Sequence, residues 1–230
     1  MKLFWLSVNN LKRTNSLIGK KLTDEWKRRW RENRIGWHED QGNLALKKYW
    51  HPQNKKCSVL VPFCGKSKDL LWLANQGHNV IGVEISEIAI DAFFNENNLD
   101  YTKNMSNDFI SYKAKEVPIT IHCGDYFEFN MSGIGALYDR GSLVAVEPSI
   151  RLKYIKHTKS LLHKAAYRFI ISLDYKEGYV QGPPYAIKIS EILSFWPDLK
   201  KTSSYNDIEN SSPKFKKSGL KKLTESIWIA

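Results

Sequence analysis

The alternation of short apolar runs with amphipathic segments predicts an α/β fold. Residues 56–63 and 79–84 are short apolar runs bounded by polar residues, as expected for buried parallel strands. Between them, residues 68–76 carry closely spaced apolar side chains and end at Gly77, a typical C-terminal stop for a helix. A second helix is expected to begin after Ser86 and to reach about residue 97. This order of strand, helix, strand and helix is typical of a doubly wound sheet.

Four more strands and two more helices continue the pattern toward the C-terminus. The strands are expected at 118–123, 134–138, 168–175 and 224–229, and the helices at 149–163 and 187–195. The segment 99–115 is polar and irregular, so we expect a loop or an insertion there. The expected fold is therefore a Rossmann-like, doubly wound α/β domain with a mostly parallel sheet and helices on both faces.

The N-terminal part of the chain divides into two segments. Residues 1–21 show neither turn chemistry nor a periodicity that fixes them on a core, and we expect a disordered tail. A helix is expected to follow, with Thr23 or Asp24 as its N-cap. We therefore expect residues 22–230 to form a single domain with an N-terminal helical lid.

Composition narrows the class of protein. With 42% hydrophobic and 26% charged residues, the chain has the composition of a folded protein and not of a disordered one. The net charge of +11 would suit nucleic acid, anionic lipid or small anionic substrates, but the basic runs at 20–34, 153–164 and 214–222 are also what solvated faces look like. The three cysteines form no C-x-x-C pair, so we expect no disulfide framework and no metal site. No apolar run suits a signal peptide or a membrane span, and we expect a cytoplasmic monomer.

Candidate binding residues follow three of the expected strands. Gly65 permits a tight turn after the first strand, and Glu84 ends the second strand, where a carboxylate can accept hydrogen bonds from ribose hydroxyls. Asp125 follows the third strand, where an acid can receive an adenine amino group. Each signal alone is weak, but a glycine turn followed about twenty residues later by an acid is the arrangement of nucleoside binding. The sequence therefore predicts a nucleoside cofactor site.

The turn after the first strand distinguishes between nucleoside cofactors. A dinucleotide fold needs G-x-G-x-x-G, but the turn has only Gly65, followed by Lys66. A phosphate-binding P-loop needs a glycine where Leu60 stands. S-adenosylmethionine has a nucleoside but no phosphate, so it suits this turn better than NAD or a nucleoside triphosphate.

Several longer blocks carry a family resemblance that extends from Leu22 over nearly the whole chain. They are W-x-x-x-W at Trp26 and Trp30, G-W-H at Gly36 to His38, P-F-C-G-K-S-K-D at Pro62 to Asp69, G-H-x-V-x-G-V-E-I-S at Gly77 to Ser86, Y-D-R-G-S-L-V-A at Tyr138 to Ala145, and G-P-P-Y at Gly182 to Tyr185. Together these blocks resemble the thiopurine S-methyltransferase family. The resemblance implies a class I methyltransferase fold, S-adenosylmethionine as methyl donor, S-adenosylhomocysteine as product, and a small thiol, selenium or tellurium compound as acceptor.

The resemblance also implies roles for individual residues. The cofactor-binding set comprises Trp26, Trp30, Phe63, Gly65, Glu84, Gly124, Asp125, Tyr126 and Arg140. Within this set Glu84 would bind the ribose, residues 124–126 would border the adenine, and Arg140 would follow the fourth strand beside the methionine end and the substrate. Trp37 would cover the acceptor together with Arg140. Phe63 stands where Leu is usual in the family and Trp37 where Phe can occur, so the acceptor preference stays open.

Two other functions remain as alternatives. Gly182 to Tyr185 is similar to the N-P-P-Y loop of nucleic-acid N-methyltransferases, although the first position is Gly and the motif follows the fifth strand instead of the fourth. A basic nucleic-acid-binding protein with a vestigial cofactor site would also explain the charge. For the thiol reaction, methyl transfer needs mainly alignment of the reacting atoms, and Arg140 would act as the catalytic residue by holding the acceptor as a thiolate.

Overall fold

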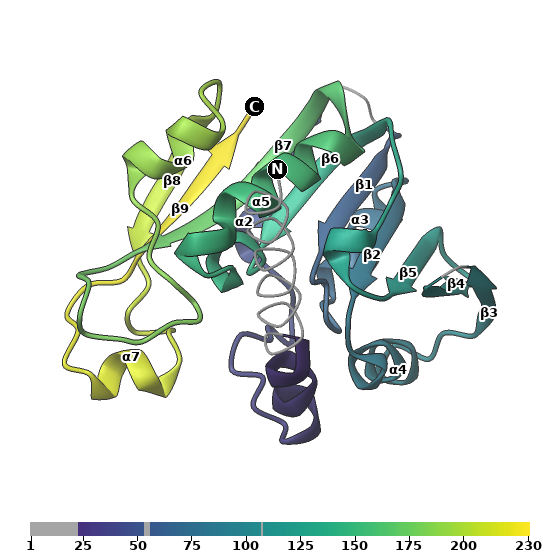
Figure 1. Cartoon of the computed structure of the whole chain (residues 1–230), viewed down its shortest axis with the longest axis horizontal. Helices are drawn as coiled ribbons and strands as arrows, with labels where there is room; N and C mark the ends of the chain where they lie inside the picture. The colour runs from purple at the N-terminus through teal and green to yellow at the C-terminus, as the bar shows by residue number, and fades with distance from the viewer. Residues whose placement is uncertain (1–22, 53–55, 107) are drawn as a thin grey trace, which may run out of the picture.

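The computed structural model describes residues 23–52, 56–106 and 108–230, so the expected disordered tail lies outside the described residues. Within this part of the chain, nine strands form one sheet in the order β3-β4-β5-β2-β1-β6-β7-β9-β8 (Figure 1). The strands are β1 Ser58–Pro62, β2 Asn79–Glu84, β3 Tyr101–Ser106, β4 Phe109–Ala114, β5 Ile119–Cys123, β6 Ile134–Arg140, β7 Leu162–Asp174, β8 Lys200–Asn206 and β9 Thr224–Ile229.

The centre of the sheet is parallel and its two edges are antiparallel. Strands β5, β2, β1, β6 and β7 run parallel to one another, whereas β3, β4, β8 and β9 pair antiparallel. The chain moves from β1 outward to β2 and β5, and it then returns to β6 on the other side of β1. Because ligands of such sheets bind beyond the carboxyl ends of the strands at this reversal, the topology places a site next to β1 and β6. The doubly wound, mostly parallel sheet that the sequence predicts is confirmed.

Helices cover both faces of the sheet. The described helices are a segment at 23–31, α2 Leu44–Tyr49, α3 Asp69–Asn75, α4 Glu87–Glu96, α5 Arg151–Leu161, α6 Ile189–Phe195 and α7 Pro213–Lys217, with 3₁₀ turns η1 Tyr126–Glu128, η2 Leu143–Ala145 and η3 Pro148–Ile150. One core joins α2, α3 and α4 to one face, and a second core joins α5 and α6 to the other. The segment 23–31 and α7 lie below the sheet in the view of Figure 1.

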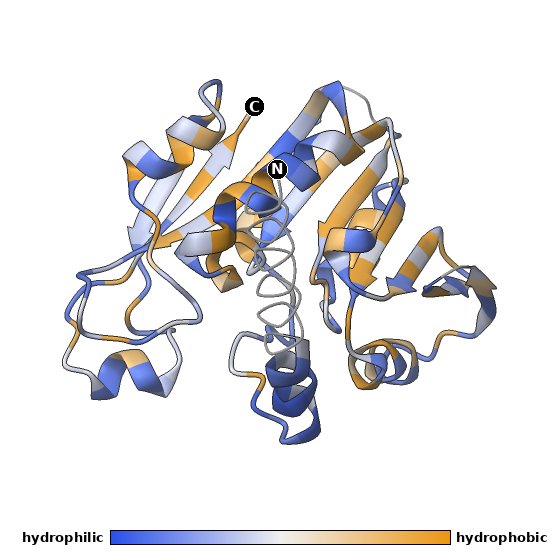
Figure 2. Ribbon diagram, in the orientation of Figure 1, coloured by the Kyte–Doolittle hydropathy of each residue, from blue (hydrophilic) through white to orange (hydrophobic). Residues whose placement is uncertain are grey.

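The alternation of side chains along the central strands explains why two cores form. In β1, Val59 and Val61 belong to one core and Leu60 to the other, and all three are buried. Burying a side chain of this size contributes about 1.5–3 kcal/mol, so a strand that is apolar on both faces is stable only between two layers of helices. Figure 2 shows the same contrast, with hydrophobic central strands and a hydrophilic segment 23–31.

Several local predictions are wrong. For the segment 99–115 a loop or an insertion was expected, and the loop is wrong, because β3 and β4 form a hairpin that is inserted between α4 and β5. The side chains of β3 are mostly exposed, so its sequence lacks the alternation of apolar and polar residues that predicts a strand. In β4, Tyr112 and Ala114 are buried. Thr23 and Asp24 are both helical, so neither is the N-cap of the first helix. Strand β6 continues to Arg140, which therefore ends the strand instead of following it.

Other elements were not predicted at all. Strand β8 is an edge strand whose residues are almost all exposed and polar, and helices α2 and α7 have only six and five residues. These elements carry little periodicity of their own, and their stability comes from packing on their neighbours. In the part of the chain that the structure describes, no helix is both long and apolar enough to cross a membrane.

Candidate cofactor and acceptor cleft

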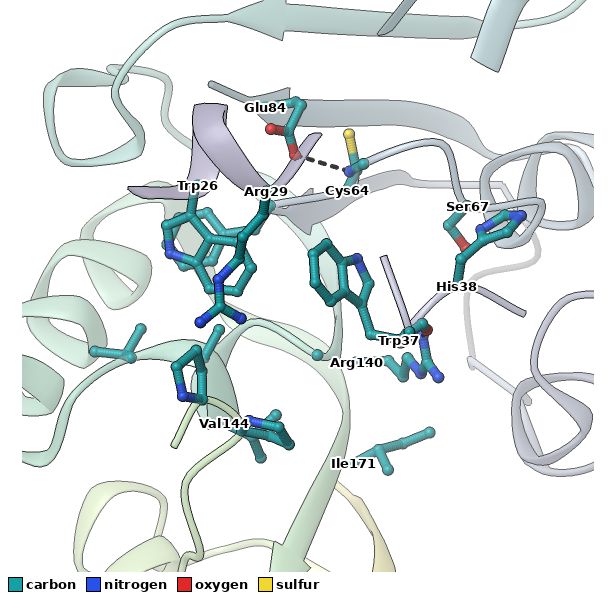
Figure 3. A pocket seen from close by; sticks show the side chains of 18 of the residues that line it. Trp26, Arg29, Trp37, His38, Cys64, Ser67, Glu84, Arg140, Val144 and Ile171 are labelled. Carbon is teal, nitrogen blue, oxygen red and sulfur yellow. Dashed lines mark hydrogen bonds between the residues drawn. The ribbon is translucent and has the colours of Figure 1, made fainter. Parts of the chain in front are cut away.

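A cleft of about 1260 Å³ opens at the carboxyl ends of the central strands. It is lined by every residue that the sequence analysis assigned to the site, namely Trp26, Trp30, Trp37, Phe63, Gly65, Glu84, Gly124, Asp125, Tyr126 and Arg140. The fold therefore brings these residues together, whereas their individual roles stay predictions. Figure 3 shows part of the cleft, with Trp37 lying between Glu84 and Arg140 in that view.

Three tryptophans form an aromatic wall of the cleft. Trp26 and Trp30 lie four residues apart on the helical segment 23–31, so they face the same side. The ring of Trp37 meets both of them edge to face, with ring centroids 5.3 Å from Trp26 and 6.0 Å from Trp30. The guanidinium of Arg29 lies over the Trp26 ring at 5.0 Å. This wall excludes water and presents flat apolar surfaces to a ligand.

The turn after β1 is tightly shaped. Phe63 and Gly65 both have positive φ, at 46° and 52°. Positive φ strains a residue with a side chain, and a Cβ added at Gly65 would stand 2.9 Å from the Trp30 ring. The Phe63 ring meets Tyr126 edge to face at 5.2 Å. Only glycine fits at position 65, because both the backbone conformation and the neighbouring indole require it.

Glu84 is a buried carboxylate that is fixed by backbone donors. Its Oε2 accepts the Gly65 N–H at 2.9 Å, which is the dashed line in Figure 3. Its Oε1 accepts the N–H groups of Ile85 and Ser86, each at 2.9 Å. Burial raises the pKa of Glu84, and these three hydrogen bonds oppose that shift. The carboxylate is therefore held rigidly at the end of β2, where it lines the cleft.

The residues that follow β5 form another part of the cleft lining. Asp125 caps η1, with its Oδ1 accepting the Phe127 N–H at 2.9 Å. A Cβ added at Gly124 would stand 2.4 Å from the Phe109 ring, so this position also has room only for glycine. The buried Tyr126 shares a hydrogen bond with Thr158, and its ring supports Phe63.

Arg140 ends β6 and is anchored by the loop that carries Trp37. Its Nη1 donates to the carbonyl oxygen of Trp37 at 2.7 Å, and its Nη2 donates to Glu39 in an ion pair. The neighbouring Asp139 is not its partner, because that carboxylate accepts from the Leu143 N–H at 2.9 Å instead. Burial raises the pKa of Asp139 to about 6. Glu39 is therefore the counter-ion of Arg140.

Several residues of the cleft were not singled out by the sequence analysis. Glu39 and Asp69 line it as acids, and His38, which Figure 3 labels, lines it as well. Burial lowers the pKa of His38, so its imidazole is neutral at pH 7. His38 and Asp69 lie in the quoted motif blocks, but a motif by itself does not say which of its polar residues face the cleft.

Lys214 is a second cleft residue that was missed. Its ammonium donates to the carbonyl oxygen of Pro183 and, at 3.5 Å, to that of Gln181. Burial, followed by the nearby charge of Arg29, lowers its pKa to about 8. Within the described residues it has no ion-pair partner. A half-buried cation that lacks a counter-ion is suited to receive an anionic ligand. From the sequence it is one residue of the basic run 214–222, which fits either a solvated face or an anion-binding surface.

Among the described residues, neither the cysteines nor the potential metal ligands form a reactive thiol site or a metal site. Cys57, Cys64 and Cys123 are free thiols, and burial raises the pKa of the cleft residue Cys64 well above its usual value. A thiol of this kind stays protonated and is a poor nucleophile. Among the described residues, no group of three or more His, Cys, Asp or Glu is arranged to hold a metal ion.

Comparison with known proteins decides the family. The family model described as thiopurine S-methyltransferase matches residues 21–230. The chain belongs to this family. Thiopurine S-methyltransferase of Photobacterium profundum is 36% identical over 207 residues, covering 89% of this chain and 96% of the relative. The enzyme of the same name from Pseudomonas syringae pv. tomato is 34% identical over 215 residues, covering 90% and 96%. The predicted family membership is confirmed. The prediction that the chain is an S-adenosylmethionine-dependent methyltransferase is confirmed with it.

Solved structures confirm the fold. The 1,6-didemethyltoxoflavin-N1-methyltransferase of Burkholderia thailandensis superposes with a TM-score of 0.56 and 14% identity, covering 90% of this chain and 86% of the other. A methyltransferase from Methanosarcina mazei has a TM-score of 0.56 and 13% identity, covering 81% and 96%. At these identities the likeness establishes the class I methyltransferase fold, and it leaves the acceptor of this chain open.

Proposed function

We propose that the enzyme transfers a methyl group from S-adenosylmethionine to the sulfur of a small anionic thiol, such as a thiopurine, or to a related selenium or tellurium acceptor. The observation that carries the proposal is the order of polar groups along the cleft. Asp125 follows β5, Glu84 ends β2, Gly65 follows β1 and Arg140 ends β6, and these four strands are neighbours in the sheet. Two acids, a close-approach glycine and a cation thus follow one another in the order in which a nucleoside continues into an amino acid.

The spacing of the strands supports this fit. Neighbouring strands lie about 4.8 Å apart, so β2 and β6, which are separated by β1, are about 10 Å apart. Glu84 at the end of β2 would hold the ribose, and Arg140 at the end of β6 would hold the amino-acid carboxylate. Gly65 lies in the turn between them, where its lack of a side chain lets the Trp30 ring pack against the backbone beside the chain that would join the two groups. When bound, S-adenosylmethionine supplies the methyl group and its sulfonium leaving group.

The protein contributes alignment and exclusion of water. Trp26, Trp30 and Trp37 form an apolar wall, and a dry, fixed surrounding lets a nucleophile approach the methyl carbon in line with the leaving sulfur. Direct displacement requires no covalent intermediate, and the buried protonated Cys64 is not suited to form one. The protein is thus proposed to act mainly by positioning.

The acceptor is proposed to be an anion because two further cations, Lys214 and Arg29, line the cleft. Lys214 is a half-buried ammonium that lacks an ion-pair partner in the described chain, and Arg29 lies close enough to lower its pKa. An acidic thiol arrives as a thiolate, and these cations would stabilise that form before the transfer. The nucleic-acid alternatives are not favoured, because the family match covers almost the whole chain. We further propose that the protein is a monomer and that it is cytoplasmic, and the free cysteines support the cytoplasmic location because they are typical of a reducing compartment.

An acceptor panel tests the proposal. The protein and S-adenosylmethionine are incubated separately with a thiopurine, an aryl thiol, selenite, tellurite and a DNA oligonucleotide, and methylated product is measured by mass spectrometry. The proposal predicts product from at least one thiol or chalcogen acceptor and none from DNA. Lys214→Gln is expected to raise KM for the ionised acceptor while leaving S-adenosylhomocysteine binding unchanged. Methylation of DNA alone would overturn the proposal.

A further inference from the structure

Glu39 is the acid that pairs with Arg140 inside the cleft. The two side chains form an ion pair, and both line the cleft. They are separated by 101 positions in the sequence, so the fold brings the acid onto the cation. The charge of Arg140 is therefore neutralised within the protein before any ligand carboxylate reaches it.

A polar network fixes the loop that carries Glu39. The Asn43 side chain donates to Glu39, at 3.2 Å to Oε2 and 3.5 Å to Oε1, and it also caps α2 by accepting the Leu46 N–H at 2.9 Å. The Asn43 N–H donates to buried Asp69 at 2.7 Å, and Asp69 also accepts from the Tyr138 hydroxyl at 2.8 Å. Because Tyr138 lies on β6 two residues before Arg140, the network ties the loop back to the strand that carries the cation.

We propose that Glu39 is a built-in counter-ion that the amino-acid carboxylate of the cofactor must displace from Arg140. Glu39 would thereby lower the affinity for ligands that carry this carboxylate and leave the binding of the nucleoside part unchanged. The proposal rests on the proposed function, because it assigns the amino-acid end of the cofactor to Arg140. It adds a residue that tunes cofactor affinity and product release.

The contacts favour displacement over a purely positioning role. The Glu39 side chain is 35% exposed and that of Arg140 is 20% exposed, so the acid is the partner that can move into water. Among the described residues, the other hydrogen bonds to the Glu39 side chain are the two long ones from Asn43, whereas Arg140 would keep its bond to the Trp37 carbonyl at 2.7 Å. Exchanging one carboxylate for another at Arg140 therefore preserves the pairing of the cation.

The test compares two ligands by isothermal titration calorimetry. S-adenosylhomocysteine carries the amino-acid end, and 5′-methylthioadenosine has the same nucleoside and a thioether but lacks that end. Glu39→Gln keeps the size and a hydrogen-bonding oxygen while removing the charge. Removing a part-exposed charge pair predicts about threefold tighter binding of S-adenosylhomocysteine and a change within about twofold for 5′-methylthioadenosine.

Two further variants test whether the effect of Glu39→Gln acts through the charge of Arg140. In an Arg140→Gln background the effect of Glu39→Gln on S-adenosylhomocysteine is expected to disappear, because no cation is left to be released. Asp198→Asn is the matched control, since it removes the acid of the Arg168 ion pair and changes the net charge equally; it is expected to leave both affinities unchanged. Weaker S-adenosylhomocysteine binding by Glu39→Gln, or equal effects on both ligands, would overturn the proposal. Absence of S-adenosylhomocysteine binding by the unmodified protein would instead contradict the proposed function.

Discussion

Replacing Glu84 by Gln is the perturbation that most directly probes the nucleoside end of the cleft. The carboxylate accepts three backbone N–H groups through its two oxygens. A glutamine side chain has one oxygen and one NH₂ group, so its NH₂ must face at least one buried N–H donor. The variant therefore loses a charge-assisted hydrogen bond and leaves a buried donor unpaired.

The magnitudes follow from these contacts. Leaving a buried donor unsatisfied costs about 1–3 kcal/mol of unfolding free energy. A hydrogen bond from a ribose hydroxyl to a charged acceptor contributes about 1.5–3 kcal/mol, so we expect S-adenosylhomocysteine to bind about tenfold to a hundredfold more weakly. Calorimetric titration measures the second effect, and thermal unfolding measured in the absence of ligand reports the first.

Glu225→Gln is the matched control for Glu84→Gln. Glu225 also lines the cleft as a buried carboxylate, but its hydrogen bond comes from the Tyr205 hydroxyl, and the proposed site gives it no contact with the nucleoside. Because Glu225 also interacts electrostatically with Arg140, its control ligand is 5′-methylthioadenosine, which lacks the amino-acid end, and the variant is expected to bind that ligand as the unmodified protein does. A folded Glu84→Gln protein whose affinity stays within about twofold of that of the unmodified protein would refute the reasoning, because such a change is far below the energy of a charged hydrogen bond.

Three further predictions follow from the site. For an acceptor that is ionised over the whole pH range of the assay, KM is expected to rise as the pH passes about 8, because Lys214 loses its proton there. Lys214→Arg is expected to abolish that rise in a pH–rate profile. Gly65→Ala is expected to destabilise the fold by about 1–2 kcal/mol and to weaken S-adenosylhomocysteine binding, because the residue has positive φ and its Cβ would meet Trp30; unchanged thermal unfolding and titration would contradict this. Arg140→Ala is expected to lower kcat/KM by at least about tenfold, and a fall of less than about threefold would count against its assigned role.

The sequence predicts the centre of the fold better than its edges, for a physical reason. Strands β1 and β2 and helices α3 and α4 are buried by their own apolar side chains, so their pattern is visible without the rest of the chain. Strand β8 and most of β3 present exposed polar side chains, and only their pairing with a neighbour makes them strands. Edge strands of this kind have no periodicity that reading a single segment can detect.

The candidate site shows the same limit. Glu84 and Gly65 are recognisable in the sequence because their proposed roles depend on local position, at the end of a strand and in the turn that follows one. Glu39 becomes a candidate only because the fold brings it into contact with Arg140. Lys214 becomes one because it contacts Pro183, which lies 31 positions away in the sequence. Burial changes the chemistry of Lys214 as well, because the same lysine in a solvated run would keep its ordinary pKa. Such residues are found only when the folded chain shows what surrounds them.

The most direct test of the central claim is calorimetric titration of the unmodified protein with S-adenosylhomocysteine, followed by a methyl-transfer assay with S-adenosylmethionine and an ionised aryl thiol. The account predicts saturable binding at a single site, and conversion of the thiol to its methyl thioether. Absence of binding would contradict the assignment of the cleft to this cofactor. Binding without methylation of any thiol, selenium or tellurium acceptor would contradict the proposed reaction while leaving the cofactor assignment in place.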